Sequence, residues 1–136
     1  MATIGTLASI LHVVFGGAWA GTVVFVALLA GDLDGSTDLG KSLLDRLRLV
    51  SRSGAAITFL TGGVMAAGYS HSYFLSAVRG WVLAAMVLLW FVLMVLVEVG
   101  AARGLDGGRS GTAVLRVAGV VAGLLLLDVG VLLGAV

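Results

Sequence analysis

Four long runs of apolar residues occupy most of this sequence, and they constrain its fold more than any other feature. A helix needs about 20 mostly apolar residues to cross the hydrocarbon core of a bilayer. The sequence predicts crossings at about 4–30, 43–70, 80–101 and 113–136. With 60% hydrophobic and 11% charged residues, the 136-residue chain has more apolar surface than a water-soluble fold of this size could bury. We therefore predict an all-α integral membrane four-helix bundle, a single domain over residues 1–136 surrounded by a lipid bilayer.

The distribution of basic residues predicts how the helices are oriented. Cytoplasmic connections of membrane proteins carry an excess of lysine and arginine. The second connection contains only Arg79, whereas the others, with the helix ends beside them, contain Lys41, Arg46, Arg48, Arg52, Arg103, Arg109 and Arg116. Tyr69, Tyr73 and Trp81 around the second connection fit an aromatic belt at the outer interface. We expect a multi-pass protein of the cytoplasmic membrane with both termini outside.

Glycines recur at a spacing of four residues in two of the predicted helices. Helices in lipid associate without a hydrophobic driving force, so small residues that let backbones approach closely are favoured at their interfaces. The pairs are Gly17 with Gly21, Gly119 with Gly123, and Gly130 with Gly134. They predict a tightly packed bundle, and they also suit a homo-oligomer or a small structural subunit of a larger membrane assembly.

Three ionisable side chains, those of His12, Glu98 and Asp128, lie within or at the ends of the predicted crossings. Burying an aspartate at the bilayer centre costs at least roughly 2.5 kcal/mol on insertion scales, so such residues are candidates for function. His12 and Asp128 lie at similar depths, about 12–13 Å from the outer helix ends. We hypothesise that they face each other, with the carboxylate fixing the imidazole tautomer. The alternative is two separately satisfied polar residues without a ligand.

Two methionines share this predicted outer half of the membrane with His12. Met65 is on the second predicted helix and Met86 on the third. Imidazole and thioether groups suit Cu(I), and they also serve as axial ligands of haem iron. A single methionine on a helix usually only packs. The candidate metal ligands are therefore His12, Met65, Met86 and Asp128.

Residues on the third predicted helix indicate a stripe that leads toward the cytoplasm. Met86, Trp90, Met94 and Glu98 recur every four residues and so share one face, directed at neighbouring helices or at a path. Glu98 would either pair with an arginine of the first or third connection or bind a cation that leaves on the cytoplasmic side. His71 in the second connection is a candidate entry ligand or an ordinary loop histidine.

Several short motifs, in order along the chain, resemble the copper-resistance D (CopD) family. Leu11-His12 followed by Trp19 and Gly21 looks like the helix-one signature of that family, and helical spacing puts His12 and Trp19 on one face. Thr61-Gly62 and Leu127-Asp128-Val-Gly are similar to the short four-helix CopD-like proteins of haloarchaea. The resemblance implies copper handling in the membrane. The candidates for a path or its support are Trp19 and Thr61 of these motifs, with Trp90, Met94 and Glu98 of the stripe.

The first helix is also similar to that of the HemJ family of haem-binding protoporphyrinogen oxidases, which would imply haem b held by His12. Both families tend to carry a lysine early in the third helix, where this chain has Ala84, Ala85 and Met86. That departure argues against protoporphyrinogen oxidation. Val64 stands where a histidine is expected after Thr-Gly-Gly in the haloarchaeal relatives.

Three functions remain open at this point. The first is a CopD-like transporter or binder of copper with an outer-leaflet site around His12; the others are a haem b protein and a structural subunit. The sequence contains no cysteine and shows no nucleophile with its base and no phosphate-binding loop, which argues against hydrolytic and phosphoryl-transfer enzymes. We therefore expect no enzyme activity, with haem-dependent redox chemistry left open. The basic residues cluster where membrane proteins carry them, so no nucleic-acid partner is expected.

Overall fold

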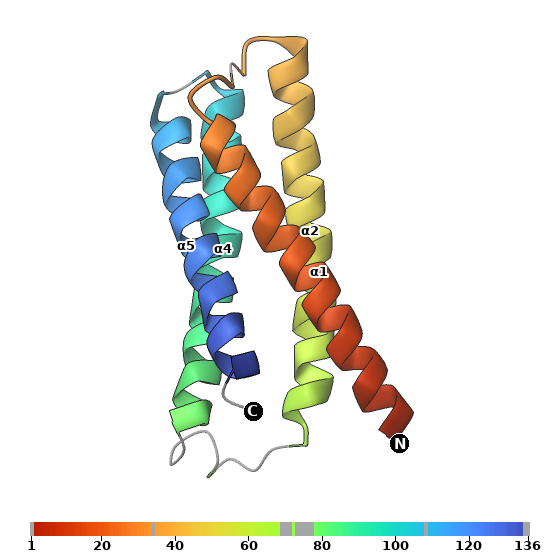
Figure 1. Cartoon of the computed structure of the whole chain (residues 1–136). Helices are drawn as coiled ribbons and strands as arrows, with labels where there is room; N and C mark the ends of the chain where they lie inside the picture. The colour runs from red at the N-terminus through yellow and green to blue at the C-terminus, as the bar shows by residue number, and fades with distance from the viewer. Residues whose placement is uncertain (1, 34, 69–71, 73–77, 108, 135–136) are drawn as a thin grey trace.

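A computed structural model describes residues 2–33, 35–68, 72, 78–107 and 109–134 (Figure 1). The described residues include four long helices: α1 (Ala2–Leu29), α2 (Asp38–Ala66), α4 (Val78–Leu105) and α5 (Arg109–Gly134). Each is long and apolar enough to cross a membrane. The prediction of an all-α four-helix bundle is confirmed.

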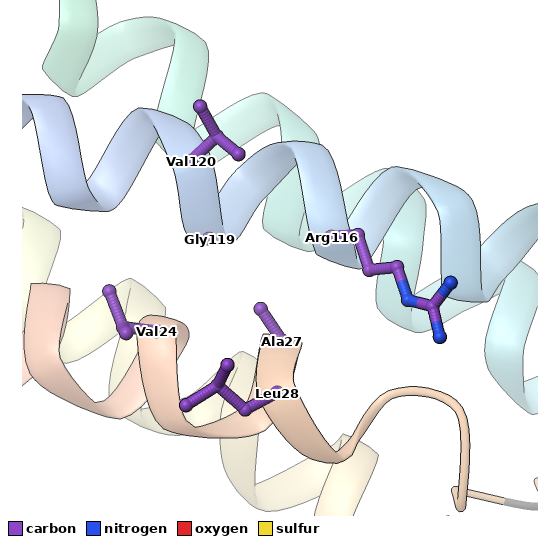
Figure 2. A pocket seen from close by; sticks show the side chains of 6 residues that line it. All are labelled: Val24, Ala27, Leu28, Arg116, Gly119 and Val120. Atoms are coloured by element: carbon purple, nitrogen blue, oxygen red, sulfur yellow. The ribbon is translucent and has the colours of Figure 1, made fainter.

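Successive helices run antiparallel, so the chain crosses the bundle four times (Figure 1). We call the end with the α1–α2 and α4–α5 connections the connection end, and the opposite end, where α1 begins and α5 ends, the terminal end. Helix α1 is inclined to the others: it reaches α5 near the connection end and lies against α2 toward the terminal end (Figure 1). Near the connection end, Ala27 of α1 faces Gly119 of α5, and Val24, Leu28, Arg116 and Val120 line a groove around this contact (Figure 2).

The helix boundaries differ from the predicted ones by one to five residues. Helix α2 begins at Asp38, five residues before its predicted start, because the Thr37 hydroxyl accepts a hydrogen bond from the Gly40 amide at 3.0 Å and so caps the helix. After α4, Gly107 has a φ of 74° and its amide bonds to Gly104 O at 3.1 Å. Glycine adopts this left-handed backbone readily, so it suits a helix C-terminus.

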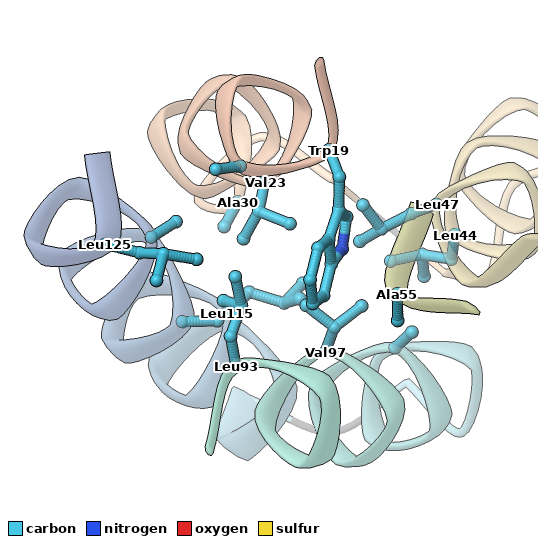
Figure 3. Packing of buried hydrophobic residues seen from close by; sticks show 14 residues of the cluster. Trp19, Val23, Ala30, Leu44, Leu47, Ala55, Leu93, Val97, Leu115 and Leu125 are labelled. Carbon is cyan, nitrogen blue, oxygen red and sulfur yellow. The ribbon is translucent and has the colours of Figure 1, made fainter. Parts of the chain in front are cut away.

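The apolar core is narrow and draws on all four helices (Figure 3). Its largest fully buried side chains include Trp19, Leu44, Leu47 and Leu93. Many large apolar side chains instead cover the outside, and Trp81 at 62% exposed is one example. Water would penalise so much exposed apolar surface, whereas a bilayer would solvate it. Tyr69, His71 and Tyr73 lie outside the described residues.

Glycines allow close helix contacts, but mostly at positions other than the predicted pairs. A Cβ atom at Gly54 would lie 2.7 Å from Trp19 Cβ, and one at Gly119 would overlap Ala27. At four other glycines of the predicted pairs, an added Cβ atom would meet nothing within 4 Å. These are Gly17, Gly21, Gly123 and Gly130. The surroundings of Gly134 are outside the described part. Because Gly119 packs within one chain, the spacing at this position reports folding rather than assembly.

The contact between Gly54 and Trp19 yields a stability prediction. Gly54→Ala forces α1 and α2 apart, so we expect it to reduce the free energy of unfolding by about 1–3 kcal/mol, the usual range for overpacking a core. Gly17→Ala is the matched control, since its methyl group enters open space and alanine favours a helix. Unfolding of the purified protein in mixed micelles measures both changes. Equal effects of the two substitutions would contradict the close packing.

Candidate functional site

One face of α2 carries hydroxyl side chains that bond to neighbouring helices. Ser51, Thr58 and Thr61 are spaced seven and three residues apart, which places them on the same side of the helix. Ser51 is 1% exposed and Thr58 is 3% exposed. A buried polar group inside a membrane protein needs a partner within the protein, because no bulk water is present. We call these three residues the hydroxyl face, and the candidate site is built on it.

Thr61 anchors His12 of α1 to the hydroxyl face. His12 Nδ1 lies 3.0 Å from Thr61 Oγ1. The single hydroxyl proton of Thr61 is directed at the carbonyl oxygen of Ile57, 2.7 Å away. Thr61 Oγ1 therefore accepts the bond from His12, which assigns the imidazole proton to Nδ1. A neutral imidazole in this state has its free lone pair on Nε2, the atom that can then bind a metal ion.

Gly62 makes room for the imidazole ring beside α2. A Cβ atom at this position would lie only 3.1 Å from His12 Cε1. Any larger residue would therefore push the ring away from Thr61. The Thr61-Gly62 pair thus has two physical tasks, because the hydroxyl fixes the ring and the glycine lets it approach.

Met65 lies at the same α1–α2 interface, closer to the terminal end. Ser9 Oγ donates toward Met65 Sδ over 3.9 Å. Ser9 precedes His12 by three residues on α1, and Met65 follows Thr61 by four on α2. Each spacing is about one helical turn, or roughly 5 Å along the axis. The antiparallel interface therefore places the imidazole of His12 and the thioether of Met65, both half-buried, about one helical turn apart along the same seam.

The other two predicted metal ligands do not join this interface. Met86 of α4 packs against the apolar core. Asp128 of α5 has a buried Oδ2 atom that lacks a hydrogen-bond partner among the described residues. The hypothesised pairing of His12 with Asp128 is not formed, because α1 inclines away from α5 toward the terminal end and His12 bonds to α2 instead (Figure 1).

Two tryptophans fill the bundle between the His12 level and the connection end. Trp19 Nε1 donates to Ser51 Oγ over 3.0 Å, and Trp90 Nε1 donates to Thr58 Oγ1 over 2.9 Å. The two rings meet edge to face with their centroids 6.2 Å apart, a favourable aromatic geometry. Trp19 is only 1% exposed. Together the rings close the middle of the bundle.

Glu98 of α4 pairs with two arginines of α2. Arg52 uses both Nε and Nη2 to donate to the two carboxylate oxygens, at 2.7 and 2.9 Å. Arg48 Nε donates to Oε2 at 3.2 Å. The prediction that Glu98 pairs with an arginine is confirmed, although the arginines belong to α2, which begins earlier than expected. Two guanidinium groups and one carboxylate leave this cluster with a formal excess of positive charge, which opposes the alternative of a cation site there.

The remaining predicted path residue, Met94, packs against the core. Sequence reasoning missed the polar partners that organise the site: Ser9, Ser51 and Thr58. The sequence could have identified them, because they are hydroxyl residues on otherwise apolar helices and share a helix face with Thr61 or His12.

Within the ranges that the structure describes, no three histidine, aspartate or glutamate side chains gather as a metal-binding group. The sequence also contains no cysteine. A hard cation such as Mg²⁺ would need several oxygen ligands. Any metal held at the α1–α2 interface would therefore depend on the imidazole of His12 and the thioether of Met65, which are donors suited to a soft metal ion.

Comparison of the chain with protein families, curated proteins and solved structures finds no significant match.

A double-mutant cycle tests the link between α1 and the hydroxyl face. Ser51→Ala leaves the buried Trp19 Nε1 without its acceptor, so we expect it to reduce the free energy of unfolding by about 1 kcal/mol. Trp19→Phe removes the donor, and Ser51→Ala should cost less in that background. Ser53→Ala, on the exposed side of the same helix turn, is the control. Strictly additive effects of the two substitutions in micelle unfolding would show that the bond is not formed.

Proposed function

We propose that this chain is a CopD-like membrane protein that binds Cu(I) through His12 and Met65 and passes copper across the cytoplasmic membrane. The observation that carries the proposal is the bond between His12 Nδ1 and Thr61 Oγ1. Metal-binding histidines usually donate their second ring nitrogen to a nearby acceptor, which fixes the ring and the tautomer. His12 has this arrangement before any metal is bound.

The chemistry of the neighbouring side chains supports a soft ion. Met65 provides a thioether about one helical turn from the imidazole along the α1–α2 interface, where Ser9 donates toward its sulfur. Thioether and imidazole groups favour Cu(I) over hard divalent cations. The resemblance of the first helix to the CopD family supports the same ion. Met86 and Asp128 were also predicted as ligands from the sequence, but the site proposed here uses neither of them.

Transport would require the middle of the bundle to open. Trp19 and Trp90 separate the His12 level from the connection end, and each indole is held by a hydroxyl of α2. Beyond them, Arg48 and Arg52 surround Glu98 with an excess of positive charge. A copper ion would therefore pass only if α2 moved relative to α1 and α4. We infer that this conformation binds copper on one side and is closed toward the other.

Copper binding is tested by titrating the purified protein with Cu(I) under reducing conditions against a chromogenic chelator. We expect one Cu(I) per chain, lost in His12→Ala and weakened in Met65→Leu. Thr61→Val should weaken binding by about 10-fold or more, since outer-shell partners typically contribute that much to metal affinity. Asp128→Asn is the control and should leave the affinity unchanged. No bound copper, and no protein-dependent copper flux into vesicles, would reject the proposal.

The same Nε2 lone pair could instead serve as an axial ligand of haem b, which is the alternative that the HemJ resemblance favours. An absorption spectrum of the purified protein separates the two. Under the copper proposal, we expect no Soret band. A Soret band that disappears in His12→Ala would replace copper with haem. Absence of both ligands would leave the role of a structural subunit.

A further inference from the structure

We propose that the groove between α1 and α5 near the connection end binds one anionic phospholipid, with an acyl chain in the groove and the phosphate on Arg116. The groove has a volume of about 380 Å³ and is lined by five apolar or small residues and Arg116 (Figure 2). This site is independent of the copper proposal, since the groove shares no residue with the α1–α2 interface formed by Ser9, His12, Thr61 and Met65.

The walls of the groove suit an acyl chain. Leu28 is 77% exposed and Val120 is 65% exposed, and both turn apolar surface outward where the bilayer lies. The floor is shallow because Gly119 packs directly on Ala27 and so adds no side chain between the two helices. A hydrocarbon chain laid along this channel would cover apolar surface that the two helices leave uncovered, with the close van der Waals contact that lipid-facing surfaces gain.

Arg116 provides the charge that selects the headgroup. It lies in the second turn of α5, about 10 Å from the start of the helix. Its Nη2 atom lies 3.0 Å from where a Cβ of Gly31 would be, so the guanidinium reaches back to the connection end while its methylene groups border the groove (Figure 2). Long basic side chains reach the membrane interface in this way. The guanidinium thus lies at headgroup depth directly above the apolar channel.

The guanidinium of Arg116 is available to a ligand as far as the described residues are concerned. Arg116 forms no hydrogen bond or ion pair with the described residues, in contrast to Arg48 and Arg52, which both hold Glu98. The nearby carbonyl of Ala30 is already bonded by Thr112 Oγ1 at 3.1 Å. A phosphate would offer two oxygens to the fork of the guanidinium, the geometry in which arginine binds most strongly.

A phospholipid fits this site better than a second copy of the chain. Stable protein interfaces bury about 800 Å² on each partner and avoid unpaired charges at their centre. An apolar helix seated in this groove would cover the Arg116 guanidinium without offering it an acceptor. A second groove, lined by Phe91, Val92, Val95 and Leu96, has about 270 Å³ and no charged residue. It therefore provides a built-in comparison for the effect of the arginine.

The test is native mass spectrometry of the detergent-purified protein with added phosphatidylglycerol or phosphatidylcholine. We expect one phosphatidylglycerol to be retained, at least tenfold more tightly than phosphatidylcholine. Arg116→Gln should abolish this preference. Val120→Phe should weaken retention of both lipids by filling the groove, whereas Val95→Phe in the second groove should not.

Arg109→Gln is the charge control, because Arg109 is exposed at the same end and does not line the groove. It should retain phosphatidylglycerol as the wild type does. Equal losses in Arg109→Gln and Arg116→Gln would overturn the proposal, since binding would then depend only on net charge. Equal retention of the two lipids by the wild type would also overturn it. Unchanged unfolding without lipid shows that each variant is folded, and copper binding serves as a separate readout.

Discussion

Hydrogen bonds that the hydroxyl face of α2 accepts from its neighbours hold the helices of this bundle together. Apolar packing alone cannot do this in lipid. Lipid is as apolar as the leucines and valines that cover the helices, so exposing them to it costs little. Ser51, Thr58 and Thr61 instead bond to Trp19, Trp90 and His12, which come from both neighbouring helices. Helix α2 therefore determines the rotation of α1 and of α4 about their axes. It also fixes which nitrogen of His12 is free, so the fold and the candidate site depend on the same three residues.

Most of the fold could be predicted from sequence because hydrophobic length in a membrane is a strong constraint. Four apolar runs predicted four helices, and all four are present, each long and apolar enough to cross a membrane. The boundaries were less predictable because they depend on local bonds, such as the cap that Thr37 provides for α2. Glycine spacing predicted close contact but not where it would occur. Gly119 packs on Ala27, whereas Gly123 meets nothing, because the inclination of α1 decides which glycines reach a neighbour.

The candidate site was predictable in its residues and less so in its pairings. Depth estimates put His12 and Met65 in the same half of the membrane because the rise per residue is fixed in a helix, and both residues lie at the α1–α2 interface. The depth of a residue gives no information about the rotation or tilt of its helix. Because His12 and Asp128 were predicted at similar depths, they were expected to face each other. The structure instead places Thr61 there, a residue identified only through its resemblance to a family motif. Glu98 was paired correctly with arginine because opposite charges at one membrane interface have few other partners.

The two indole–hydroxyl bonds have a consequence for how such a sequence can diverge. An indole nitrogen only donates, and its acceptor here is a single hydroxyl, so losing that hydroxyl leaves the indole N–H without a partner inside the bundle. Substitutions at positions 19 and 51 are therefore expected to be correlated among related sequences. The same is expected of positions 58 and 90. The lipid-facing leucines and valines are not constrained by a specific partner in this way. Related sequences should thus show paired substitutions at the bonded positions of α2 and independent substitutions on the lipid-facing surface.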